Sequence, residues 1–184
     1  MRLVSRSGSS VELHIAGYQF PDARPHGDED WDANWLIISG QVDAGRRLRW
    51  EFRDPSLTTW EASELIAWMR QVSAGEVAPA GDDQKAPTEE RLGQAEGQAE
   101  APDHWSRLTD AGWLTFVEPN LAFAVAPYVA DRVHLRVGLG AESGPPPVDR
   151  TTPDWHEITL NISRDEVLAA GAALERELLA FPAR

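Results

Sequence analysis

The sequence contains no cysteine, a single lysine and no long hydrophobic run. The absence of cysteine excludes disulfide bonds, thiolate metal sites and cysteine nucleophiles, and it fits a reducing compartment. Because no stretch of about 18 apolar residues exists, we expect no transmembrane helix. The first ten residues hold too short an apolar stretch for a signal peptide. From these absences we expect a cytoplasmic protein.

Basic residues are also scarce, since 17 Lys and Arg face 30 Asp and Glu and the net charge is −13. Nucleic-acid binding requires clustered basic side chains that neutralise phosphates, so this charge argues against a nucleic-acid partner. It permits a basic protein partner, and it also keeps a protein soluble. Apolar residues make up 42% of the chain and include eight tryptophans, which is enough for a substantial core.

Residues 74–103 differ in composition from the rest of the chain. They are mainly Gly, Ala, Pro, Glu, Gln and Asp, and they include no aromatic residue. Between residues 75 and 104, eight acidic residues stand against two basic ones, so nearly half of the net charge lies there. Such a composition buries too little apolar surface to offset the entropy of ordering. We therefore predict a flexible acidic insertion at about 74–103, with a functional acidic tether as the alternative.

Apolar and polar residues alternate in several short stretches, which is typical of half-buried strands. The triplet Asp54-Pro55-Ser56 is predicted to end one of them, because proline interrupts strands. The predicted strands cover residues 11–15, 35–42, 48–53, 113–117, 121–125, 133–139 and 158–162.

Two capping boxes, at residues 58–61 and 163–166, mark the starts of two helices. Apolar residues at helical spacing follow each box, over 62–72 and 167–178. Short strands joined mostly by hairpins, with only two helices, favour antiparallel pairing over βαβ winding. We predict the α+β class, with a mainly antiparallel sheet of about seven strands and two amphipathic helices. The whole chain, 1–184, is expected to form a single domain that the acidic insertion interrupts.

The stretch 28–35 combines four carboxylates with two tryptophans. Its acids at alternate positions begin like a calcium-binding EF-hand loop. However, Ala33 stands where that loop requires glycine, and its twelfth position is Ser39, inside an apolar strand. We therefore expect a solvated acidic loop and no metal, with the turn held by hydrogen bonds from Asp32 or Asn34 to the backbone.

Catalytic signatures are missing from the rest of the sequence. No two histidines are spaced four residues apart on a helix, and no serine stands in a Gly-x-Ser-x-Gly elbow. The stretch Gly138-Leu139-Gly140 is not followed by Lys-Ser or Lys-Thr, so it does not form a phosphate-binding loop. Nothing differentiates the acids of the 28–35 stretch into the acid and base of a glycoside hydrolase. We expect no enzyme activity and no cofactor.

Tryptophans are the most informative side chains for binding. Trp31 lies in the acidic loop, and an exposed tryptophan among charges is typical of a protein-binding hot spot. Trp60 and Trp68 fall beside the apolar stripe of the first helix, at the edge of the core or facing a partner. Strand phase assigns three others to the core: Trp35, Trp50 and Trp113.

Five blocks span nearly the whole chain outside the acidic insertion: VELHIAGYQFP at 11–21, WDANWLIISGQV at 31–42, DPSLTTWEASELIAWM at 54–69, TFVEPNLAF at 115–123 and ITLNISRDEVLAAGAALERELLAFPAR at 158–184. In these blocks the sequence resembles the WapI-like family of bacterial immunity proteins. The resemblance implies a small cytoplasmic α+β protein that protects a bacterium from a secreted toxin of the contact-dependent or polymorphic kind. The acidic insertion is longer than the family leads us to expect, and the resemblance fixes no toxin-contacting residue.

The resemblance and the charge together suggest a non-enzymatic immunity protein that binds a cognate, basic toxin protein, such as a nuclease. Charge complementarity would speed the encounter and suppress wrong partners. Two alternatives stay open: a cytoplasmic interaction or ligand-binding domain unrelated to toxins, and a metal-dependent hydrolase built on the acidic loop. The residues expected to contact the partner are Asp28, Glu29, Asp30, Trp31 and Asp32.

Overall fold

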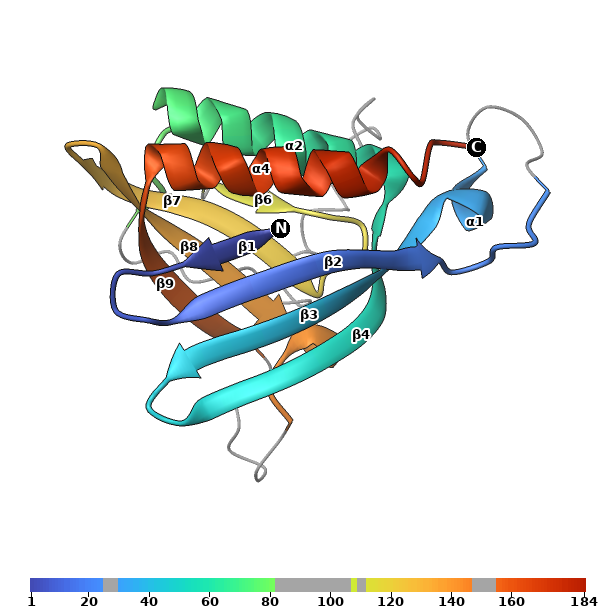
Figure 1. The fold of residues 1–184 in the computed structure, drawn as a ribbon, viewed down its shortest axis with the longest axis horizontal. Helices are drawn as coiled ribbons and strands as arrows, with labels where there is room; N and C mark the ends of the chain where they lie inside the picture. Colours follow the sequence, from blue (N-terminus) through green and yellow to red (C-terminus); the bar gives the residue numbers. More distant parts are fainter. Residues whose placement is uncertain (25–29, 82–106, 109–111, 147–154) are drawn as a thin grey trace.

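The computed structural model describes residues 1–24, 30–81, 107–108, 112–146 and 155–184. Across these residues the chain forms two antiparallel sheets covered by a pair of helices (Figure 1). The first sheet contains, in spatial order, β1 (Arg2–Val4), β2 (Ser10–Tyr18), β3 (Trp35–Gly45) and β4 (Leu48–Thr58). The second contains β5 (Arg107–Leu108), β6 (Trp113–Thr115), β7 (Leu121–Val129), β8 (Arg132–Gly140) and β9 (Trp155–Ser163).

A helix follows the last strand of each sheet, at the positions that the two capping boxes predict. The helix α2 (Thr59–Ala74) follows β4, and α4 (Arg164–Leu178) follows β9. Both boxes are complete, with the Thr58 and Ser163 side chains as the caps. Two short helical turns complete the description: α1 (Trp31–Asn34) and a 3₁₀ turn, η1 (Ala141–Ser143).

The prediction of an α+β protein with antiparallel strands is confirmed. The strands are divided between two sheets, and successive strands are neighbours within each sheet. Four elements lie outside the predicted ones, because two to four residues are too few to produce a periodic pattern: β1, α1, β5 and η1.

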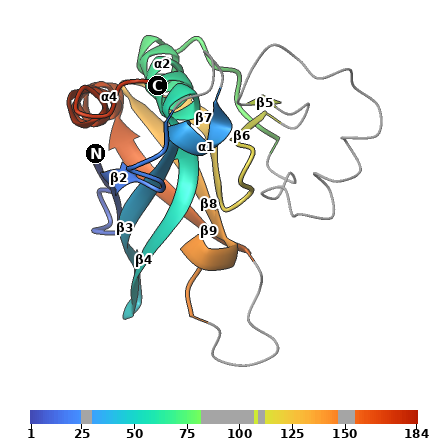
Figure 2. The same cartoon turned by 90° about the vertical axis from the view of Figure 1, so that its right-hand side faces the viewer.

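One hydrophobic core joins the two sheets and the two helices. It contains residues of β2, β3 and β4 together with residues of β7, β8 and β9 and the inner faces of α2 and α4. The helices lie side by side across the strands (Figures 1 and 2). Gly171 lies where they approach closely, since a Cβ atom on it would lie 3.3 Å from Cβ of Met69, which is a tight contact.

The first part of the predicted acidic insertion packs against this core. The helix α2 ends at Ala74, and Gly75 caps it in the left-handed conformation. Val77 and Ala80 are buried, and the Ala80 N–H donates to the Val125 carbonyl at 2.7 Å. The remainder of the predicted insertion, 82–103, lies outside the described residues.

The predicted strand break at Asp54-Pro55-Ser56 is wrong, because β4 continues to Thr58. Two features allow Pro55 inside the strand. In the described sheet β4 is an edge strand, so one of its sides needs no hydrogen-bond donors. The register also shifts between Leu36 and Ile37, opposite Pro55, so the ladder is irregular there.

The assignment of Trp35 to the core is also wrong. Trp50 and Trp113 are buried as predicted, but Trp35 is only partly buried. Leu36 and Ile38 occupy the inward phase of β3 and are 0% and 1% exposed. Since successive strand residues point to opposite faces, Trp35 lies on the outer face of this strand.

Glu61 is a fully buried carboxylate at the junction of the two sheets. Its Oε2 accepts the Thr58 N–H at 2.7 Å in the capping box, and its Oε1 accepts the Val117 N–H at 2.6 Å from the loop after β6. Burial raises the pKa of Glu61 from 4.5 to about 7, although the hydrogen bonds from Val117 and Thr58 oppose the rise.

The raised pKa of Glu61 predicts a pH-dependent stability. The folded protein keeps a proton on Glu61 at pH values where the unfolded chain has lost it, so stability falls as the pH rises from 4.5 to about 7. This contribution amounts to about 3 kcal/mol at most. Urea unfolding at pH 5 and pH 7.5 should show a larger loss for the wild type than for Glu61→Gln.

The second capping box offers a matched control. Hydrogen bonds from Ser163 lower the pKa of the exposed Glu166, so its contribution is present above the unfolded pKa and is lost as the pH falls. Glu166→Gln should therefore leave the loss between pH 5 and 7.5 unchanged. Parallel pH profiles for the wild type and Glu61→Gln would contradict the assignment to Glu61.

Candidate protein-interaction surface

The predicted partner-binding stretch, residues 28–32, includes the first two residues of the turn α1. Of its five residues, Asp28 and Glu29 lie outside the described residues. The Asp30 side chain caps α1 by accepting the Ala33 N–H at 3.2 Å. Trp31 is partly buried and Asp32 is exposed. The turn therefore presents a tryptophan and a carboxylate side by side.

Asn34, the last residue of α1, holds this turn in place and is fully buried. Its Nδ2 donates to the carbonyls of Asp30 at 2.7 Å and Arg184 at 2.8 Å. Its Oδ1 accepts the Thr59 hydroxyl and the Arg184 N–H, both at 2.9 Å. The amide thus connects α1, the start of α2 and the segment after α4. Of the two residues expected to hold the turn, Asn34 makes the bond to the backbone.

The segment after α4 packs against the end of β2. The Arg184 guanidinium lies 3.4 Å from the centre of the Tyr18 ring and donates to the Pro21 carbonyl at 3.0 Å. The Tyr18 hydroxyl donates to the Pro182 carbonyl at 2.5 Å, and the Phe181 ring meets Tyr18 edge-on. These contacts fix residues 181–184 beside α1.

Three partly buried tryptophans meet at this end of the molecule, and we call them the tryptophan ridge: Trp31, Trp35 and Trp60. The ring centre of Trp31 lies 6.4 Å from that of Trp35 and 5.9 Å from that of Trp60. Trp31 therefore connects the start of β3 to the start of α2. The sequence left the position of Trp60 open, and its partial burial places it at the edge of the core.

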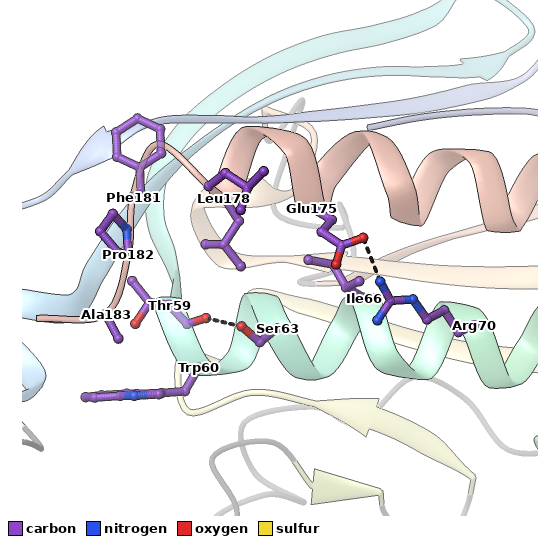
Figure 3. Close-up of a pocket in the computed structure, with 11 residues that line it drawn as sticks. Thr59, Trp60, Ser63, Ile66, Arg70, Glu175, Leu178, Phe181, Pro182 and Ala183 are labelled. Carbon is purple, nitrogen blue, oxygen red and sulfur yellow. Dashed lines mark hydrogen bonds and ion pairs between the residues drawn. The ribbon is translucent and has the colours of Figure 1, made fainter.

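An apolar groove of about 350 Å³ lies beside Trp60, between α2 and the end of α4 (Figure 3). Ile66, Leu178 and Phe181 line it. Leu179, which also lines the groove, is 78% exposed. Arg70 and Glu175 line it too, and their side chains pair with each other at 2.6 Å.

An acidic groove of about 460 Å³ lies beside Trp35, another member of the ridge. Phe20, 45% exposed, lines it together with Trp35. No lysine or arginine is among the described residues that line this groove. Its carboxylates come from α1, β4, the loop after β6 and η1: Asp32, Asp54, Glu118 and Glu142.

The acidic groove places negative charges near one another. Burial raises the pKa of Asp54, and the negative charge of Glu142 raises it further. A hydrogen bond from the Asn120 amide, at 3.1 Å, opposes this rise. A cation in the groove would relieve the repulsion between Asp54 and Glu142.

The described residues contain no group of side chains placed to bind a metal ion. Within that part of the chain, no three His, Asp or Glu residues are grouped so that they could hold an ion. No helix among the described elements is both long and apolar enough to cross a bilayer. The described histidines contact neighbouring side chains: His14 contacts Glu12 and Glu177, His134 contacts Asn161, and His156 contacts Trp50.

Comparison with protein-family models identifies the class of protein. Residues 2–182 match the model of the Immunity protein WapI-like family, and the chain belongs to this family. Neither the curated proteins nor the solved structures gave a match. Membership of an immunity protein family indicates a toxin-neutralising role.

Asn34→Ala should destabilise the protein by about 2–4 kcal/mol, because it leaves several buried polar groups without partners. It should also separate α1 from α2 and alter the near-UV circular dichroism of the tryptophan ridge. Urea unfolding would measure the first effect and circular dichroism of the folded protein the second. Gln41→Ala is the control, since it removes an exposed amide from β3 and should change stability by less than about 0.5 kcal/mol. Equal stability of the two variants would contradict the role given to Asn34.

Proposed function

We propose that this protein is a non-enzymatic immunity protein that binds and neutralises one cognate bacterial toxin domain. The observation that carries the proposal is the family match over residues 2–182. The net charge of −13 and the acidic groove support a basic partner. A nuclease fits this description, because enzymes that grip phosphate backbones carry clustered basic residues.

Neutralisation requires only a stable surface that covers the active site of the toxin or blocks its substrate. A mainly folded, preorganised surface loses little conformational freedom on binding, which favours tight complexes. Negative charge also steers a basic toxin toward the protein and raises the association rate at low salt. We place this encounter in the cytoplasm, where an arriving toxin would meet its target.

The toxin-contacting residues that we propose begin with the acidic loop Asp28, Glu29, Asp30, Trp31 and Asp32. Asp32 is exposed, and Trp31 belongs to the tryptophan ridge. A half-buried tryptophan next to an exposed carboxylate has the composition of an interface hot spot.

Co-expression with the toxin encoded beside its gene tests the function. Cells that make the toxin alone should die, and cells that also make this protein should survive. The purified proteins should form a complex in size-exclusion chromatography, and the complex should lack toxin activity. An unrelated acidic protein of similar size is the control for non-specific charge effects. Undiminished killing in the presence of this protein would refute the proposal.

The acidic loop has its own test. Replacing Asp28, Glu29, Asp30 and Asp32 with the matching amides should lower the association rate about tenfold at low salt. The amide of Asn at position 30 can still cap α1, so the fold should be kept. Stopped-flow association at two salt concentrations provides the measurement, and the difference should shrink at high salt. An unchanged rate at low salt would remove this loop from the steering surface.

A further inference from the structure

The tryptophan ridge joins two grooves of different chemistry into one surface. Trp60 borders the apolar groove, Trp35 borders the acidic groove, and Trp31 contacts both of these rings. The ridge is therefore bordered by the apolar groove, which we call the apolar flank, and by the acidic groove, which we call the acidic flank. The ridge lies at the end of the molecule where α1 meets the segment after α4 (Figure 1).

The apolar flank fits a single aliphatic or aromatic side chain of a partner. Its lining comes from two packed helices and from the segment that contains Phe181 (Figure 3). Leu179, at 78% exposed, has the largest exposed fraction of the described large hydrophobic side chains. Tight interfaces are typically centred on an apolar side chain in such a pocket, surrounded by a polar rim.

The acidic flank fits a cation carried by the same partner. Of its carboxylates, Asp32 and Glu142 are exposed and Asp54 is partly buried. The aromatic rings of Phe20 and Trp35 share this groove, and a guanidinium binds well over such faces. The protein already uses this contact internally, because the Arg136 guanidinium lies 4.7 Å from the centre of the Trp113 ring.

We propose that the tryptophan ridge and its two flanking grooves form the toxin-docking face, and that its occupant is a toxin segment with an apolar side chain flanked by arginine or lysine. The apolar side chain enters the groove between α2 and α4, and the basic side chains enter the acidic groove. This inference rests on the proposed function. The acidic flank excludes a nucleic acid, and the combination of an apolar pocket with an adjacent anionic groove selects a polypeptide.

Hydrogen bonds of two buried side chains, Asn34 and Glu61, hold this face in place. The hydrogen bonds of Asn34 fix α1 against α2, and the hydrogen bond from Val117 to Glu61 fixes the loop that carries Glu118. A surface whose groups are already in place loses less freedom on binding than a mobile loop would.

Two pairs of matched variants test the face with the purified toxin domain encoded by the neighbouring gene. The double variant Asp32→Asn, Glu142→Gln removes charge from the acidic flank, and Asp131→Asn, Glu51→Gln removes the same charge at exposed positions elsewhere. The first variant should slow association about tenfold at low salt and much less at high salt, whereas the second should change it less than about twofold.

The apolar flank is tested by Leu179→Ser against Leu168→Ser, which alters an exposed leucine near the other end of α4. Leu179→Ser should raise the dissociation rate about tenfold at every salt concentration, and Leu168→Ser should leave it unchanged. Phe20→Ser tests the aromatic edge of the acidic groove in the same way, and its side chain is exposed enough for the fold to tolerate the change.

The outcomes separate this face from the function itself. If the wild type protects cells and binds the toxin, but the Leu179, Phe20 and Asp32/Glu142 variants bind as tightly and as fast, the face is wrong and the function stands. If the wild type does not bind the toxin, both proposals fail. Sedimentation tests the other occupant: a wild-type dimer that Leu179→Ser converts to a monomer would assign the apolar groove to a second copy of this chain.

Discussion

The buried carboxylate of Glu61 is the constraint on which the arrangement of the two sheets depends. One oxygen closes the capping box that starts α2 after the first sheet, and the other accepts the Val117 N–H from the loop of the second sheet. Both oxygens must find donors, because an unpaired buried carboxylate is costly. The side chain therefore fixes the start of α2 and the loop after β6 relative to each other. Glu118, the next residue in that loop, is consequently held beside β4 and lines the acidic groove.

A second buried polar side chain, Asn34, completes the same end of the molecule. Its amide satisfies groups from α1, α2 and the segment after α4, so three segments that are distant in sequence meet at one point. The helices α2 and α4, which approach closely at Gly171, also supply most of the lining of the apolar groove. The shape of this surface therefore depends on buried contacts, because buried side chains such as Asn34 position the segments that form it.

The sequence predicts those parts of the fold that local patterns control. Capping boxes and apolar periodicity lie within a few neighbouring residues, and both helices begin where the boxes predict. Trp35 was misassigned because residues 35–38 are all apolar, so no polar residue marks which face each one occupies at the start of β3. The tryptophan ridge and the two grooves depend on contacts such as Asn34 with Thr59 and Arg184, which no local pattern encodes. The acidic loop contributes Trp31 and Asp32 to the proposed surface, whereas Trp60, Asp54 and Glu142 join them only through the tertiary fold.

Repulsion between carboxylates in the acidic groove would favour the binding of a basic partner. Glu142 and burial both raise the pKa of Asp54, so the isolated protein holds this carboxylate in an unfavourable environment. Elsewhere among the described residues a carboxylate is paired with a basic side chain, as Glu157 is with Arg136, whose paired atoms lie 2.7 and 2.8 Å apart. Basic side chains of a partner would relieve the repulsion, and this relief adds to the free energy of association. On this argument, the raised pKa of Asp54 in the free protein and the preference that we propose for a basic toxin have the same physical origin.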